Sequence, residues 1–381
     1  MLRVLLLFVL AVAIGACGGS DPEPVDAPDL LGPFAVGHTV FTPIDASRDD
    51  RSLLVDVWYP IDAEDAQDAP RTTYDLAAGI GLDSKVALEG LPVSARQNQT
   101  LLVFSHGYGG INTQSVDLME ALASHGFIVA SPEHTGNAQP SFTDEFDVAA
   151  ANRVPDVSFV IDTMLARSRD PEDDFVDRLD ESRVGVVGDS FGAMTAIGMA
   201  AGWAGAAPDP RVAAIAPVSG VIDPGLQSDP RTSPNAGFDA DQLASITVPV
   251  MLVGGTEDTT VPIENNEIAF EQITNAPNVY KVDVIGATHT HFANICSIGN
   301  MLIDDLGLGQ EVWPDIGAEA LLEPYEVTCS AEAFPIEEAT RLQNLYVVSF
   351  FKRHLLDQKG YDQYLKSDYA DGEPAIEFSV K

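Results

Sequence analysis

Apolar residues in this chain fall into two alternating patterns, short continuous runs and longer segments with apolar residues at three- or four-residue spacing. Continuous runs are typical of strands buried on both faces, and the spaced pattern is typical of amphipathic helices. The runs predict strands at 53–58, 101–105, 127–130, 184–187, 212–216, 248–253 and 279–285. The spaced segments predict helices at 113–125, 154–168, 192–204, 263–274 and 336–356. This alternation predicts an α/β fold whose mostly parallel sheet carries helices on both faces.

Three further segments add detail to the predicted fold. A short acidic turn at 45–51 joins runs at 39–44 and 53–58, which predicts an antiparallel hairpin at the sheet edge. In 336–356, apolar residues at three-residue steps predict a helix that docks one face; they are Leu342, Leu345, Val348 and Phe351. Periodicity weakens between about 296 and 334. We therefore expect one domain over 34–381, with an excursion at 296–334 rather than a second domain.

The first residues have the pattern of an export signal. Arg3 precedes an apolar run over 4–16, which is shorter than the roughly 20 residues needed to span a bilayer. Ile14-Gly15-Ala16-Cys17 looks like a bacterial lipobox, so 1–16 is predicted to be a signal peptide and Cys17 the lipid-bearing residue. The acidic, Pro- and Gly-rich segment 17–33 then reads as a flexible tether. An ordinary signal peptide with an incidental Cys17 is the alternative to this membrane-anchored, exported lipoprotein.

The chain carries 20 basic and 58 acidic residues, a net charge of −38. Such a surface repels the phosphates of nucleic acids and anionic membranes, so a nucleic-acid partner is not expected. Adaptation to salty surroundings and an acidic face kept for solubility both account for this charge.

Apart from Cys17, the chain has two cysteines, Cys296 and Cys329. In an oxidising compartment an even pair suggests one disulfide, with two free buried thiols as the alternative. Neither cysteine has neighbours at zinc-ligand spacing, so no metal is predicted.

Candidate chemistry begins at the pentapeptide Gly188-Asp189-Ser190-Phe191-Gly192, which lies between the strand at 184–187 and the helix at 192–204. A GxSxG sequence between strand and helix is the pattern of a nucleophile elbow, in which glycines allow the sharp turn that presents the serine. Ser190 is therefore the predicted nucleophile. A serine needs a base, an acid that orients the base, and donors for the developing oxyanion.

The acid and the base are expected after later strands. Asp258 follows the strand at 250–255 and is the predicted acid, with its neighbour Glu257 as the alternative. His289 follows the strand at 279–285 and is the predicted base, with His291 as the alternative. The order serine, acid, histidine is the order in which the hydrolase fold places its triad.

Oxyanion donors are predicted from the glycine-rich loop 106–110, directly after the strand at 101–105. The backbone N–H groups of Tyr108 and Phe191 are the expected pair. His106 is expected to shape this loop rather than to transfer protons.

Together these segments resemble the α/β-hydrolase superfamily, and within it platelet-activating factor acetylhydrolases and bacterial dienelactone-hydrolase-like esterases. The resemblance runs from about residue 53 to 296 and rests on FSHGYGG at 104–110, GFIVASPEHTGN at 126–137, VGDSFG at 187–192, GGTEDTTVP at 254–262 and GATHTHFANIC at 286–296. A His-x-x-Phe pattern in that group is similar to His289 and Phe292, which favours His289 as the base. The resemblance implies a cofactor-independent hydrolase of short or modified acyl esters, including phospholipid acetyl esters.

Two departures and three alternatives accompany this resemblance. Dienelactone hydrolases use a cysteine nucleophile, so their substrate does not carry over to Ser190. Asp189 stands where related esterases often have His or Trp, so it either alters the pH dependence of the elbow or faces solvent. The segment GATHTHFAN also looks like that of cutinase-type polyester hydrolases, so a polyester hydrolase or lipase is the first alternative. Acyl transfer and a noncatalytic surface binding lipoprotein are the remaining alternatives.

Overall fold

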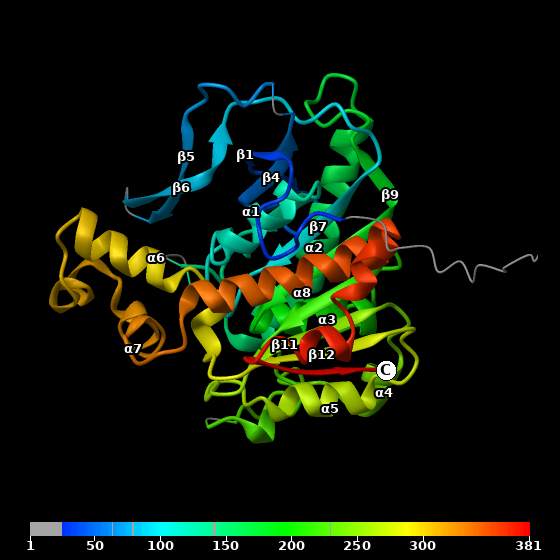
Figure 1. The fold of residues 1–381 in the computed structure, drawn as a ribbon, viewed down its shortest axis with the longest axis vertical. Coiled ribbons are helices and arrows are strands. Elements are labelled where there is room, and N and C mark those ends of the chain that lie inside the picture. The colour runs from blue at the N-terminus through cyan, green and yellow to red at the C-terminus, as the bar shows by residue number, and fades with distance from the viewer. Residues whose placement is uncertain (1–24, 63, 78–79, 140–141, 229) are drawn as a thin grey trace, which may run out of the picture.

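The computed structural model describes residues 25–62, 64–77, 80–139, 142–228 and 230–381 (Figure 1). The predicted signal peptide 1–16, Cys17 and the first part of the tether lie outside the described residues. Within the described residues, no helix has the length and apolar character needed to cross a membrane.

An eleven-stranded sheet forms the centre of the molecule, in the order β13-β12-β11-β10-β9-β7-β8-β4-β1-β6-β5. The strands from β12 to β8 in this order are parallel to one another. They are β7 (Gln99–Ser105), β8 (Ile128–Pro132), β9 (Leu179–Asp189), β10 (Val212–Val218), β11 (Val250–Gly255) and β12 (Val279–Val284). Each coincides with a predicted strand, and the α/β class is confirmed.

The remaining strands flank this parallel core. β13 (Ile376–Val380) pairs antiparallel with β12, and β4 (Val55–Ile61) pairs antiparallel with both β8 and β1 (Ala35–Phe41). The predicted hairpin of β1 and β4 is present, and its turn contains the small β2 (Ile44–Asp45) and β3 (Arg51–Ser52) pair. Its predicted place at the sheet edge is wrong, because β6 (Ile80–Glu89) and β5 (Arg71–Ala77) extend the sheet beyond β1.

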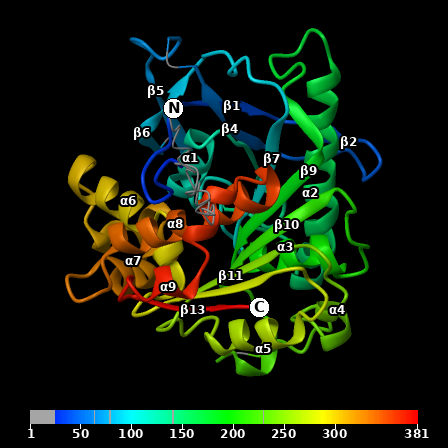
Figure 2. The same ribbon diagram turned by 45° about the vertical axis from the view of Figure 1, so that its right-hand side comes forward.

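Helices cover both faces of the sheet (Figures 1 and 2). On one face lie α1 (Val116–Ser124) and α8 (Ile336–Leu356), and the predicted stripe of α8 is fully buried there. On the other face lie α2 (Phe146–Arg169), α3 (Phe191–Ala201), α4 (Ala240–Ala244) and α5 (Glu264–Gln272). Each face has its own apolar core, so the sheet is desolvated on both sides and holds its strand ends rigidly.

Helix α2 begins at Phe146 rather than at the predicted residue 154. Pro155 suggests a helix start, because proline is favoured in the first turn and disfavoured in a helix interior. Burial of Ala149 and Ala150 against the sheet stabilises the additional turns. This extension contains Arg153.

The segment after the last parallel strand forms a small lobe. It contains α6 (Ile295–Asn300), a π-helical turn (Met301–Asp305) and α7 (Leu322–Cys329), and the predicted Cys296–Cys329 disulfide joins α6 to the end of α7. Trp313 and Leu302 form its apolar centre, which packs against the β5–β6 hairpin. Figures 1 and 2 show this lobe beside that hairpin at one side of the sheet.

The predicted flexible tether extends too far toward the domain. Within the described part of the tether, Leu30 accepts a hydrogen bond from His125, and the Gly32 N–H donates to Ser124 Oγ at 2.8 Å. Phe34 N–H donates to the Ser124 carbonyl. Residues 30–34 are therefore fixed to the end of α1, a tertiary contact that the polar composition of the segment does not reveal.

Candidate active site

Ser190 lies in the sharp turn between β9 and α3. Its φ of 58° and ψ of −114° place it in a region that residues with a Cβ rarely adopt. A Cβ on Gly188 would approach the Gly192 carbonyl oxygen at 2.2 Å, and one on Gly192 would approach the Ser105 carbonyl oxygen at 1.7 Å. Both glycines are therefore required by close packing, and the turn presents the serine hydroxyl at the carboxyl end of the sheet.

The three residues predicted as a triad lie in one hydrogen-bonded chain. His289 Nε2 is 3.0 Å from Ser190 Oγ, and His289 Nδ1 is 2.7 Å from an Asp258 carboxylate oxygen. The other Asp258 oxygen accepts hydrogen bonds from the backbone N–H groups of Thr260 (2.9 Å) and Val261 (2.7 Å). The carboxylate is thereby fixed in orientation, and it in turn fixes the imidazole.

The alternative acid and base point elsewhere. His291 is buried, and its Nδ1 lies 2.8 Å from both the N–H and the hydroxyl of Thr288. Its Nε2 lies 2.9 Å from the Phe334 carbonyl oxygen, so both ring nitrogens are occupied away from Ser190. Glu257 is exposed, and Asp258 rather than Glu257 contacts His289.

His289 has the electrostatic surroundings of a base. Burial alone would lower its pKa, but the hydrogen bond and charge of Asp258 outweigh burial, so the pKa is raised above 6.5. Asp189 and Glu323 add to this increase. Glu323 belongs to α7, and Thr328 of the same helix contacts Thr290 beside the base. The disulfide-linked lobe thus lies next to the loop that carries His289.

The predicted oxyanion donors belong to two chain segments next to Ser190. Phe191 is the first residue of α3, where the backbone N–H groups have no partner within the helix. Tyr108 lies on the loop after β7, and a Cβ on Gly107 would be 3.5 Å from Ser190 Cβ. The rings of Tyr108 and Phe191 are in edge contact, with centroids 5.1 Å apart. The structure therefore brings together next to Ser190 the two segments from which oxyanion donors are predicted.

Aromatic side chains surround this part of the site. Phe142 and Phe146 contact the Tyr108 ring, with centroid distances of 5.1 and 5.8 Å. Phe142 is 40% exposed, so this cluster presents an apolar surface to solvent. Arg231 lies over the rings of Tyr108 and Phe146 and adds a positive charge at the rim.

Asp189 does not face solvent. Its side chain is 3% exposed, one carboxylate oxygen accepts a hydrogen bond from Gln114 Nε2, and the other has no hydrogen-bond partner among the described residues. Burial raises the pKa of Asp189 to about 7, with His289 opposing the shift and Asp258 adding to it. Gln114 was not identified from the sequence, because only the tertiary fold brings it to the elbow.

Replacing Asp189 with asparagine is expected to change how stability depends on pH. The native carboxyl stays protonated up to about pH 7, whereas the unfolded one ionises near pH 4, so wild-type stability falls as pH rises between these values. Above pH 7 the accumulated loss is on the order of 4 kcal/mol. Asp189→Asn cannot ionise, so its stability relative to wild type should increase from pH 5 to pH 8. Urea unfolding at both pH values measures this difference, and a constant difference would contradict the assignment.

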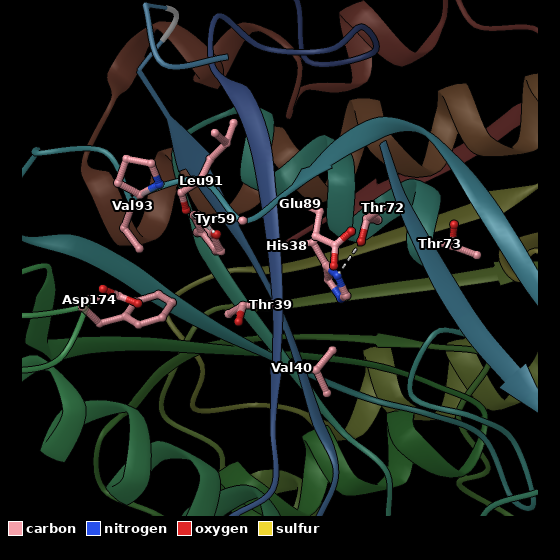
Figure 3. A pocket seen from close by; sticks show the side chains of 13 residues that line it. His38, Thr39, Val40, Tyr59, Thr72, Thr73, Glu89, Leu91, Val93 and Asp174 are labelled. Carbon is pink, nitrogen blue, oxygen red and sulfur yellow. Dashed lines mark hydrogen bonds between the residues drawn. The ribbon is translucent and has the colours of Figure 1, made fainter. Parts of the chain in front are cut away.

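A cavity of about 680 Å³ lies in another part of the molecule, against β1, β5 and β6. Tyr59, Thr72 and Glu89 are among its lining residues, together with His38 (Figure 3). His38 hydrogen-bonds Thr72 at 3.0 Å and Asp56 at 2.6 Å, so its ring nitrogens are satisfied structurally. The lining includes none of Ser190, Asp258 and His289, and we assign this cavity no role in the chemistry.

Comparisons with known proteins agree with this architecture. Residues 91–278 match the family model described as Chlorophyllase, a span that contains Ser190 and Asp258 and ends before His289. A solved structure, a ferulic acid esterase from Streptomyces cinnamoneus, is similar over 94% of this chain and 98% of its own, with 23% identity and a TM-score of 0.61. Among curated proteins, the search found no match. The structural likeness supports a common fold over nearly the whole described chain.

Proposed function

We propose that this chain, which shares the fold of a solved esterase and matches the Chlorophyllase family model over residues 91–278, is a serine hydrolase of carboxylic esters. The observation that carries the proposal is the continuous hydrogen-bonded chain from Ser190 Oγ through His289 to Asp258. A noncatalytic binding protein has no need of this arrangement, because binding alone uses neither a base nor a strained nucleophile.

The geometry supports a two-step reaction. His289 Nε2 takes the Ser190 proton as Oγ attacks the ester carbonyl carbon, and the N–H groups of Tyr108 and Phe191 stabilise the resulting oxyanion. The bond to the alcohol oxygen then breaks, and the alcohol leaves with the proton held by His289. Water attacks the acyl-serine with His289 again as base, which releases the carboxylic acid and restores Ser190. An alcohol in place of water would give acyl transfer by the same residues.

For the substrate, we propose esters of short or modified acyl groups, including phospholipid acetyl esters, as the family resemblance implies. A second class is favoured by the aromatic cluster of Tyr108, Phe142 and Phe146, which suits an aromatic acyl group. The structurally similar ferulic acid esterase makes feruloyl esters a direct probe of this second class. Aliphatic polyesters are the remaining candidate, from the cutinase-like histidine segment.

A hydrolysis profile tests these substrates. The panel is 4-nitrophenyl esters from acetyl to palmitoyl, an acetylated phospholipid, methyl ferulate and an aliphatic polyester film. We expect kcat/KM to be highest for acetyl to butyryl esters and to fall for palmitoyl. A preference for methyl ferulate would support the aromatic class, and release of soluble acids from the film would support the polyester class. Absence of hydrolysis across the panel would contradict the proposal.

We also propose that the enzyme is an exported lipoprotein anchored through Cys17. The lipobox-like Ile14-Gly15-Ala16-Cys17 and the oxidising compartment implied by the Cys296–Cys329 disulfide support this. In a bacterial host, Cys17→Ser should move the protein from the membrane fraction to the soluble fraction. Retention of the variant in the membrane fraction would exclude the lipid anchor.

A further inference from the structure

Arg153, on α2, is fully buried behind the oxyanion loop. Its Nη2 donates to the Gly107 carbonyl oxygen at 2.9 Å, and its Nη1 donates to the His106 carbonyl oxygen. Its guanidinium also lies over the Phe191 ring, 4.7 Å from the centroid. One side chain thus contacts both segments that supply oxyanion donors.

The Gly107 carbonyl matters because it shares a peptide unit with the Tyr108 N–H. In a trans peptide the C=O and N–H groups point in opposite directions within one plane. A donor that holds the Gly107 oxygen on the buried side therefore turns the Tyr108 N–H toward the opposite side. We infer that Arg153 is a positioning residue for ester hydrolysis, which orients the Gly107–Tyr108 peptide so that its N–H stabilises the oxyanion. This inference rests on the proposed function.

Three further contacts hold the same peptide unit and its neighbour, and one of them is the Gly110 N–H, which donates to the Gly107 oxygen at 3.2 Å. His106 Nε2 accepts a hydrogen bond from the His134 N–H at 3.1 Å, which leaves the ring proton on Nδ1 to donate to the Gly107 oxygen at 2.8 Å. On the other side, Gln114 Oε1 accepts from the Gly107 N–H at 3.0 Å. Gly107 is therefore held at both its N–H and its C=O, and Arg153 supplies the charged donor.

Arg153 is itself anchored by a buried polar chain. Its Nη1 donates to Ser105 Oγ at 3.2 Å, Ser105 contacts His134 Nε2 at 2.9 Å, and His134 Nδ1 contacts Asp156 at 2.9 Å. Asp156 is bonded in turn by Arg51. The chain has the residue types of a catalytic triad, but Ser105, His134 and Asp156 are at most 1% exposed, so substrate does not reach it. Its place behind the loop fits a supporting role.

The burial of Arg153 is difficult to explain by its contribution to stability alone. Burial lowers its pKa to about 9, the nearby charge of Asp156 opposes this shift, and the group stays protonated at neutral pH. No carboxylate among the described residues forms a direct ion pair with it, and its partners are two backbone carbonyls, Ser105 and Asn137. A buried charge without a paired carboxylate is costly, so simple stability is a poor explanation for its presence. The presence of this charge is explained if it polarises the Gly107–Tyr108 peptide, so that the Tyr108 N–H becomes a stronger donor to a negative charge.

The test compares Arg153→Met and Arg153→Lys with wild type on 4-nitrophenyl acetate. Loss of the orientation should lower kcat about 100-fold in Arg153→Met, the scale of one lost oxyanion donor, with KM changed less than about threefold. Arg153→Lys keeps the charge but cannot donate to two carbonyls with fixed fork geometry, so about a tenfold loss in kcat is expected. Inhibition constants for a trifluoromethyl ketone should rise in parallel with the loss of kcat/KM, because its adduct carries the oxyanion.

Arg167→Met is the matched control, since Arg167 is also on α2 and stacks on Phe41 and Phe175 away from the loop. It should leave kcat within about twofold. If Arg153→Met does not fold, Arg153→Lys decides. Folded Arg153 variants with unchanged kcat, or with unchanged affinity for the trifluoromethyl ketone, would overturn the inference. Failure of the proposed function is separately visible, because wild type would then show neither ester hydrolysis nor fluorophosphonate labelling.

Discussion

Ser190→Ala is expected to lower kcat for 4-nitrophenyl acetate by about 10⁶, the scale found when the serine of such a unit is removed. The alanine has no hydroxyl to accept the acyl group, while His289 and Asp258 remain in place. Residual activity of roughly 10³ over the uncatalysed reaction should persist, because the Tyr108 and Phe191 N–H groups still stabilise an oxyanion formed by attack of water. Stability should change little, since the substitution removes only one oxygen atom.

Steady-state kinetics and labelling by a fluorophosphonate probe measure this effect together. Ser219→Ala is the matched control, because Ser219 is a buried serine with positive φ at the end of the neighbouring strand β10. Its hydroxyl forms no hydrogen bond with any described residue, so the variant should keep kcat within about threefold. Labelling that survives in Ser190→Ala, or a kcat close to wild type, would show that another residue is the nucleophile.

The parallel core of the sheet was predictable because each of its strands is buried on both faces and therefore reads as a continuous apolar run. The β5–β6 hairpin was missed for the complementary reason. In β5, Thr72 and Tyr74 are buried while Arg71, Thr73 and Asp75 are exposed, so polar residues interrupt the apolar signal. The tether was also predicted to be too long. Its length was judged from composition, but residues 30–34 are fixed to the end of α1 by individual hydrogen bonds, which composition does not reveal.

The same distinction applies to the candidate site, where residues that follow strands were predictable and residues placed by tertiary contacts were not. Ser190, Asp258 and His289 each follow a strand of the parallel sheet, and the carboxyl ends of parallel strands meet at one edge, so chain order alone places them near one another. The choice of His289 over His291 rested on its closer position after the strand and on a family pattern, and the contacts of the two rings separate them structurally. Arg153 and Gln114 follow no strand and belong to no motif. Arg153 reaches Gly107 from helix α2 and Gln114 reaches it from the turn before α1, and the sequence pattern specifies neither contact.

Asp258→Asn should lower kcat by about 10⁴, because the asparagine would hold His289 in the wrong tautomer. Thr260 and Val261 donate their N–H groups to one side-chain oxygen of Asp258, so the asparagine carbonyl must keep that position. Its NH₂ group then faces His289 Nδ1 and donates to it. The imidazole proton is thereby forced onto Nε2, which can no longer accept the proton of Ser190.

The pH dependence and a neighbouring carboxylate provide the checks. The charge of Asp258 raises the pKa of His289, so its removal should shift the acidic limb of the kcat/KM profile to lower pH while the maximum falls. Glu257→Gln is the matched control, since it removes the same charge one residue away without touching His289, and its kcat should stay within about twofold. A large loss in Glu257→Gln with a small loss in Asp258→Asn would reverse the assignment of the acid. A kcat loss in Asp258→Asn without any movement of the acidic limb would mean that the variant fails through misfolding rather than through the histidine.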